Sequence, residues 1–560
     1  MPDGGTTGCS FRFSFRGRRG MALGLTWTLR RWLSRCSRIL PGVSRAGAAG
    51  LLLLLPACAP APEPGPGRPA SARSRVVAEN SRPGNRDWEL SNPATGREIE
   101  GYASAASVRA GDSIAFHVSA RSGRFDTRIY RLGWYGGAGA RLVSSIRGTP
   151  GMARDLPEPR QQDGLVACRW PASLRIGTGT DWQSGVYLAR LTDAGTGKQA
   201  YVPFVVRELL GSTAPYLLLL NTTTWQAYND WGGTSLYDFN SRRRARALRV
   251  SYDRPYGSGP GAWRGLGAGE LLTTPHTARK AGWEYPMIRW LERNGIETAY
   301  AADLDLADST LIAGRRGLLI AGHPEYWSRL MRDALERARD AGTGLALFGA
   351  NAGYWQIRVE PSADGAAGRV LFCSKDYTRD SLFDTAADRD LTVRFRNLHP
   401  RRPEVALLGV MTARGEESVE ADFVPIPAMR NSWIYRGTGV AKGTTRALAG
   451  LVGYETDRSF LGDSLYGKWS PAGLEVLSCS PIRFKDGSTE NSEAVSYRAP
   501  SGAVVFSIGS VQWSWGLDDW GSPALRPKRR HQDAERITLN VIGALGAGDA
   551  APAPSARSPR

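Results

Sequence analysis

Polar side chains follow two short apolar runs in the middle of the chain. His323 and Glu325 come directly after Gly317–Gly322, and Asn351 comes soon after Leu345–Phe348. Each run has the length of a buried parallel strand. Because ligands of open α/β sheets bind just past the carboxyl ends of the strands, these three side chains are predicted to share one crevice. An imidazole next to a carboxylate can move a proton, and an amide can hold a polar substrate.

A helix is predicted between these two strands, which completes a strand–helix–strand unit. Ser328 can cap its start and Gly342 can end it. Leu330, Leu335 and Ala338 keep an apolar helical face between the two ends.

The alternation of strands and helices begins at Ala214 and places two aromatic loops after other strands. The apolar strand Tyr216–Leu220 precedes a long polar and aromatic loop that contains Tyr228, and a possible strand Leu248–Tyr252 precedes a loop that contains Tyr256. We therefore predict an α/β domain over residues 208–547 with a mostly parallel sheet, of the glutamine-amidotransferase or flavodoxin-like kind.

Residues 86–207 carry a different pattern, with short alternating runs separated by turn signals such as Ala110-Gly111-Asp112. This pattern is common in immunoglobulin-like sandwiches. The chain is therefore predicted to be multidomain, with an N-terminal immunoglobulin-like β-sandwich before the α/β domain.

The N-terminal 57 residues are predicted to be an export signal rather than part of the fold. Nine arginines precede the short apolar run Ala46–Leu55, and the sequence Leu55-Pro56-Ala57-Cys58 resembles a lipoprotein cleavage site. Cys58 would then carry the lipid that anchors the protein to the membrane, with plain cleavage nearby as the alternative. Residues 58–85 are expected to be a disordered Pro/Ala-rich tether and residues 548–560 a disordered tail. The predicted location is the cell envelope or periplasm.

Composition excludes several functional classes. The net charge is +19, but no nucleic-acid-binding motif accompanies it, so no nucleic-acid partner is expected. The cysteines lack zinc spacing. The chain has no HExxH, GxSxG or GxxxxGK[ST] motif.

Eight stretches between Tyr130 and Asp519 together resemble the N,N-dimethylformamidase large (beta) subunit family. They are YRLGWYGGAGARLV, NTTTWQAYNDWGG, YDRPYG, YPMIRWLERNG, GHPEYWS, LFGANAGYW, LVGYETD and GSVQWSWGLDD. The resemblance implies hydrolysis of a small amide at one ferric ion, Fe(III), held by two tyrosinates and one glutamate. The family enzyme also works with a small subunit, so a partner subunit or a homo-oligomer is a further expectation.

Carried over to this chain, the resemblance implies metal ligation by Tyr228, Tyr256 and Glu325. Tyr252 is the alternative to Tyr256, because the segment between the two aromatic loops differs in length from the family enzyme. His323 and Asn351 would position substrate or ligands, and Glu455 of LVGYETD would be the acid–base partner. Hard oxygen donors suit a ferric ion, and a carboxylate–histidine pair could pass the proton of water to the leaving amine.

Each of these residues also has a structural interpretation. Tyr228 could pack beside tryptophan, Glu325 could favour the start of the following helix, and Glu455 could form an ion pair. The sequence therefore leaves two functions open. One is an exported iron-dependent amidohydrolase that cleaves a linear, non-peptide amide bond. The other is a non-catalytic envelope lipoprotein that binds a carbohydrate or another envelope ligand in an aromatic crevice.

Overall fold

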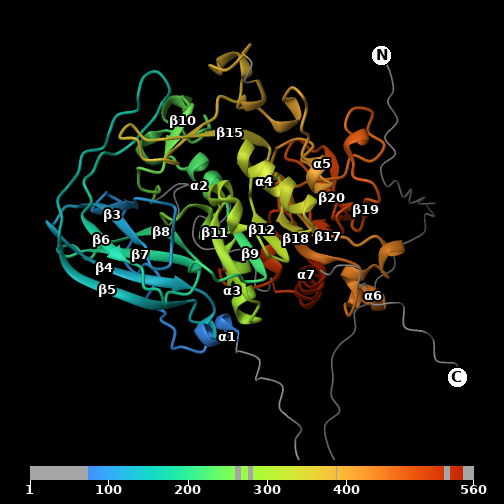
Figure 1. The fold of residues 1–560 in the computed structure, drawn as a ribbon, viewed down its shortest axis with the longest axis horizontal. Helices are drawn as coiled ribbons and strands as arrows, with labels where there is room; N and C mark the ends of the chain where they lie inside the picture. Colours follow the sequence, from blue (N-terminus) through green and yellow to red (C-terminus); the bar gives the residue numbers. More distant parts are fainter. Residues whose placement is uncertain (1–73, 259–265, 275–281, 386–387, 522–529, 547–560) are drawn as a thin grey trace, which may run out of the picture. The chain divides into compact units, whose positions relative to one another are not determined.

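The computed structural model describes residues 74–258, 266–274, 282–385, 388–521 and 530–546. The fold is rich in mixed sheets and has few helices (Figure 1). The predicted signal, Cys58 and the predicted tail lie outside the described residues. None of the helices in the described ranges is both long and apolar enough to span a membrane.

Two sheets form the N-terminal part of the described chain. One has the order β1 (Ile99–Ala103), β3 (Ser113–Ala120) and β6 (Leu174–Gly177). The other has the order β2 (Ser107–Arg109), β8 (Gln199–Arg207), β7 (Gly185–Asp193), β4 (Arg124–Leu132) and β5 (Ala140–Pro150). Phe116, Ile129 and Phe204 belong to one apolar core that the two sheets share. Two sheets around a common core agree with the predicted sandwich, and its immunoglobulin-like topology stays a prediction.

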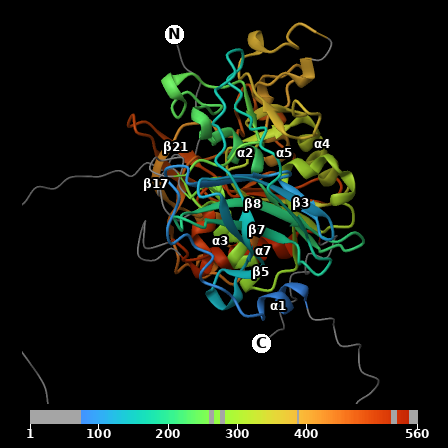
Figure 2. The ribbon, with the colours of Figure 1, turned by 90° about the vertical axis from the view of Figure 1, so that its left-hand side faces the viewer.

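The inner strands of the five-stranded sheet are buried on both faces. One face contributes to the core shared with β1 and β3, and residues of the other face, such as Leu188 and Val205, pack in a core that also contains α3 (Tyr285–Arg293). Figures 1 and 2 show the ribbon of α3 beside this sheet. The strands β7 and β8 are therefore buried over almost their whole length, whereas the sequence had suggested alternation.

A seven-stranded sheet forms the centre of the α/β part. Its order is β11 (Thr298–Ala302), β9 (Tyr216–Leu220), β12 (Gly317–Gly322), β14 (Gly344–Gly349), β23 (Val504–Ser507), β22 (Val495–Arg498) and β19 (Glu475–Val476). The first five strands are parallel to one another, β22 is antiparallel to β23, and β19 is antiparallel to β22, which confirms a mostly parallel sheet. Counted along the chain, the parallel strands lie in the order 2-1-3-4-5, so the order reverses between β9 and β12.

Helices cover both faces of this sheet (Figure 1). Alternate residues of β9 and β12 enter two different cores. One core contains α3 and α7 (Gln532–Ala544), and the other contains α4 (Arg329–Asp340). Burial on both faces explains why these strands appear in the sequence as uninterrupted apolar runs. Ser328 caps α4 as predicted, because its hydroxyl accepts a hydrogen bond from Met331 N at 3.2 Å.

Smaller elements complete the fold. A four-stranded sheet contains β10 (Arg249–Ser251), β16 (Val370–Phe372), β15 (Trp355–Glu360) and β13 (Tyr326–Ser328). Two hairpin-like pairs join β17 (Ser418–Phe423) to β18 (Leu448–Tyr454) and β20 (Ser480–Arg483) to β21 (Thr489–Ser492). The short helices are α1 (Arg75–Asn80), α2 (Thr222–Tyr228), α5 (Val405–Leu408) and α6 (Gly439–Lys442).

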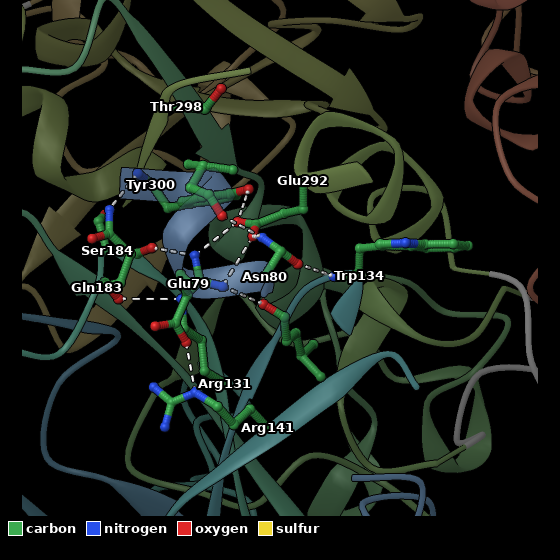
Figure 3. A network of polar contacts seen from close by, with 12 residues as sticks. Glu79, Asn80, Arg131, Trp134, Arg141, Gln183, Ser184, Glu292, Thr298 and Tyr300 are labelled. Atoms are coloured by element: carbon green, nitrogen blue, oxygen red, sulfur yellow. Dashed lines mark hydrogen bonds and ion pairs between the residues drawn. The ribbon is translucent and has the colours of Figure 1, made fainter. Parts of the chain in front are cut away.

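The predicted disordered tether over residues 58–85 extends too far. Helix α1 lies within it, and its Val76 is fully buried. The carboxylate of Glu79 accepts a hydrogen bond from Arg141 Nε at 2.7 Å (Figure 3). It also accepts one from Tyr135 OH at 2.7 Å. Burial of one apolar side chain and pairing of one acid hold this segment in place.

A buried ion pair connects β4 to α3. Arg131 Nη2 lies 2.7 Å from Glu292 Oε1, Arg131 Nη1 lies 3.1 Å from Glu292 Oε2, and both side chains are 0% exposed. Tyr300 of β11 donates to Glu292 Oε1 at 2.9 Å, and Arg131 donates to the Ser184 carbonyl at 2.8 Å (Figure 3). A buried ion pair contributes specificity, and removal of one partner leaves an uncompensated charge.

We expect Glu292→Gln to lower the free energy of unfolding by about 3–5 kcal/mol, because Arg131 would keep its charge in the interior. Urea denaturation measures the change. The matched control is Glu417→Gln, which removes the partner of the 75%-exposed Lys485 and is expected to cost less than about 1 kcal/mol. Equal losses in the two variants would contradict a special role for the buried pair.

Candidate functional site

The predicted crevice lies at the carboxyl ends of neighbouring strands. Tyr228 ends helix α2, which follows β9, whereas His323 and Glu325 follow β12 and Asn351 follows β14. Glu455 comes directly after β18. The strand order reverses between β9 and β12, which is where ligands bind in open α/β sheets. The structure thus brings five of the six residues proposed for metal binding and catalysis into one place.

Helix α2 was missed by the sequence, which predicted a loop here. All seven of its residues are buried. Asp303 holds its start by accepting from Thr222 Oγ1 at 2.6 Å and Thr223 N at 3.1 Å. Its Thr224 hydroxyl accepts from the backbone N of Glu325 at 3.1 Å. The helix therefore positions two parts of the site, Tyr228 directly and Glu325 through its main chain.

Two phenols and one carboxylate converge at the centre of the site. Tyr228 OH lies 2.8 Å from Glu325 Oε2, and Tyr237 OH lies 2.5 Å from Glu325 Oε1. The two phenol oxygens are 3.1 Å apart. A backbone hydrogen bond of 2.9 Å from Leu236 N to Ala227 O joins the residues that precede the two tyrosines. This hydrogen bond brings the two ends of the loop between Tyr228 and Tyr237 together, so that the two phenols lie side by side.

Tyr256 and its alternative Tyr252, which were predicted as the second tyrosine ligand, do not lie beside Glu325 in the structure. Tyr252 OH is 3.1 Å from Thr222 Oγ1, and the Tyr256 ring packs edge-on against Trp225 with centroids 6.5 Å apart. No hydrogen bond in the described ranges joins either phenol to Glu325. Tyr237 takes the place beside Glu325. Sequence reasoning passed over it, although it lies only nine positions after Tyr228.

His323 lies between two carboxylates. Its Nε2 is 2.8 Å from Glu455 Oε2, and its Nδ1 is 3.2 Å from Glu270 Oε2. Burial favours the neutral imidazole, but Glu455 and Glu270 outweigh it and hold the pKa of His323 well above its ordinary value. Glu270 belongs to a short 3₁₀ turn, Gly269–Leu271, and sequence reasoning missed it because such turns have no periodic signal.

Asn351 contacts Glu455. Its Nδ2 donates to Glu455 Oε2 at 2.5 Å, and its backbone N donates to Asp457 Oδ1 at 2.9 Å. The backbone of Asn351 has a φ of 52° and that of Tyr454, which precedes Glu455, a φ of 60°. Such left-handed conformations are strained for residues other than glycine and occur often at functional sites.

Lys375 lies behind Tyr237. Its Nζ is 3.3 Å from the centroid of the Tyr237 ring, with Tyr326 and Trp355 at 5.4 and 5.1 Å. This ammonium has no hydrogen-bond partner among the residues that the structure describes. Burial lowers the pKa of Lys375 to about 8, although Glu325 acts in the opposite direction. A cation is thus held against one of the two phenol rings.

The donor set fits a hard, highly charged cation. Within the described part of the chain, no group of three or more His, Cys, Asp or Glu side chains is arranged to hold a metal ion. The converging donors here are instead phenols and a carboxylate, whose oxygens suit Fe(III). Burial raises the pKa of Glu325, and the charge of Glu455 raises it further. Burial and then Glu325 raise the pKa of Tyr228 well above its ordinary value. A cation bound between the phenols and the carboxylate would lower the pKa values of Tyr228 and Glu325 again.

Comparisons with known proteins identify the family of this chain. The family described as "N,N-dimethylformamidase beta subunit-like, C-terminal" matches residues 126–529. Over 231 residues the chain is 28% identical to the N,N-dimethylformamidase beta subunits of Alcaligenes sp and of Paracoccus aminophilus. Each alignment covers 36% of this chain and 29% of the relative, so the chain spans less than a third of the length of these curated relatives. Since the family match extends over well more than half of the sequence and includes every residue of the site, the protein belongs to the N,N-dimethylformamidase beta subunit-like family.

Proposed function

We propose that this protein is an iron-dependent amidohydrolase that cleaves the C–N bond of a small, linear, non-peptide amide. The observation that carries the proposal is the convergence of Tyr228, Tyr237 and Glu325 beside the His323–Glu455 pair. The names of the two relatives, which are N,N-dimethylformamidase subunits, support an amide as substrate.

Tyr228, Tyr237 and Glu325 would hold one ferric ion, and their three side chains leave other coordination positions open. A ferric ion bound there would supply Lewis acidity toward an amide carbonyl and toward water. The phenols would bind as phenolates, which stabilise the ferric state.

Glu455 is the group best placed to accept a proton from the attacking water. Asn351 fixes one of its carboxylate oxygens by a 2.5 Å hydrogen bond, and His323 approaches the same oxygen at 2.8 Å. Water would add to the amide carbon while its proton passes to Glu455. The same proton would then pass to the leaving nitrogen as the C–N bond breaks, which releases an amine and a carboxylic acid that keeps the second proton of the water and loses it to solvent. Glu270 would orient His323 for this exchange.

Two features of the chain bear on the surroundings of the reaction. Lys375 would place a positive charge against the Tyr237 ring and thereby favour its phenolate.

The basic leader and Cys58 support export to the cell envelope, with a lipid on Cys58 as the anchor. Because both relatives are named beta subunits, we also propose assembly with a second subunit or with further copies of this chain.

We expect the purified chain, reconstituted with iron, to bind near-stoichiometric iron and to show a broad visible phenolate-to-iron band. Tyr228→Phe and Tyr237→Phe should each weaken that band and lower the iron content, because each removes one oxygen donor. Elemental analysis and visible absorption measure both effects. Tyr256→Phe is the matched control, since its ring packs on Trp225, and it should keep the band.

A loss of the band in Tyr256→Phe with retention in Tyr237→Phe would refute the ligand assignment. Absence of iron and of the band in the unmodified chain would refute the proposed function itself.

Glu455→Gln should lower amide hydrolysis by about 10²- to 10⁴-fold, because glutamine keeps the shape of the side chain but cannot take a proton. Iron content and thermal stability should stay close to those of the unmodified chain. Glu475→Gln, at an exposed position of β19, should leave activity unchanged. Hydrolysis is followed by release of amine from small formamides and acetamides. Undiminished activity in Glu455→Gln would assign the base to another group.

A further inference from the structure

The segment Asp253-Arg254-Pro255-Tyr256 follows β10 and contains a buried arginine that the reaction does not use. Arg254 is 1% exposed. Its guanidinium points at main-chain carbonyls: Nη1 donates to Trp231 O at 3.1 Å and to Thr234 O at 2.9 Å. Its Nη2 donates to Asn229 O at 2.8 Å and to Gln226 O at 3.4 Å. One side chain thus binds four carbonyls along a stretch of nine residues.

This stretch includes Tyr228 and ends shortly before Tyr237. Gln226 lies in the last turn of α2, two residues before Tyr228, and Thr234 lies three residues before Tyr237. A buried helix end leaves carbonyls without intrahelical partners, and a buried carbonyl needs a donor. Arg254 supplies donors to the end of the helix and to the turn that follows it.

The main chain around Arg254 is fastened to the same turn. Asn229 Nδ2 donates to Pro255 O at 3.0 Å, and Asn229 Oδ1 accepts from Gly257 N at 3.0 Å. The guanidinium therefore approaches from a fixed backbone. Because its donors diverge in one rigid plane, it can bind carbonyls on both sides of a turn, which the single ammonium of lysine cannot reproduce.

We propose that Arg254 is a positioning residue that curves the chain between Gln226 and Thr234 so that the phenols of Tyr228 and Tyr237 meet at Glu325. This inference rests on the proposed function for its link to iron. The conformation of residues 226–237 can be measured without iron.

The test uses Arg254→Lys and Arg254→Met in the full chain. We expect iron affinity to fall by about 10- to 100-fold, as for other groups that orient metal ligands, and the visible band to weaken and shift. In the metal-free protein, hydrogen–deuterium exchange of peptides covering residues 226–237 should rise by about tenfold, because the carbonyls lose their shared donor.

Arg332→Lys and Arg332→Met are the matched controls. Arg332 is 0% exposed and so is buried like Arg254, but it lies in α4 and donates to Glu336 and to the Pro403 carbonyl. Its replacement should lower thermal stability by a comparable amount and leave the iron band and the exchange of residues 226–237 unchanged. A change of these two readouts in the Arg332 variants equal to that in the Arg254 variants would overturn the inference.

Unchanged exchange and an unchanged band in both Arg254 variants would also overturn it. If the unmodified chain binds no iron, the proposed function fails, and the exchange of residues 226–237 still decides whether Arg254 holds this segment.

Discussion

The site depends on helix α2, which is short and buried at every residue. The backbone N–H and carbonyl groups at its two ends must therefore find hydrogen-bond partners inside the protein. Helix α2 is too short to be stable alone, and three threonines at its start are poor helix formers. Asp303 accepts from its first residues, and Arg254 donates to its last turn. A buried acid and a buried base thus hold the two ends of the element that carries Tyr228. Any change at either end is transmitted to the phenol.

The reacting groups are also buried, so their charges must be balanced within the crevice. Glu325 faces two phenols, and His323 faces two carboxylates, all within one buried crevice. Such an arrangement concentrates acidic groups where water is largely excluded, and it requires protons or a cation to be stable. Positive φ angles occur at Asn351, which donates to Glu455, and at Tyr454, which precedes Glu455, so the surrounding fold keeps the backbone strained on both sides of this carboxylate.

The sequence predicts the strands and strand ends of the central sheet well because burial on both faces leaves uninterrupted apolar runs. Tyr216–Leu220 and Gly317–Gly322 have the predicted bounds, and His323, Glu325 and Asn351 therefore lie where expected. The second tyrosine could not be predicted in this way. Its position depends on the Leu236–Ala227 hydrogen bond and on Arg254, contacts that arise only from the tertiary fold. Tyr256 belongs to the motif YDRPYG, which resembles the family more clearly, but in the structure this motif holds the turn after α2 through Arg254 and Asn229.

The most direct test of the proposed iron site is a crystal structure of the iron-reconstituted protein, with anomalous data collected on both sides of the iron absorption edge. The account predicts one anomalous peak bonded to the phenol oxygens of Tyr228 and Tyr237 and to the carboxylate of Glu325. A peak beside Tyr256 or Tyr252, or no peak at this crevice in a protein that retains iron, would contradict it.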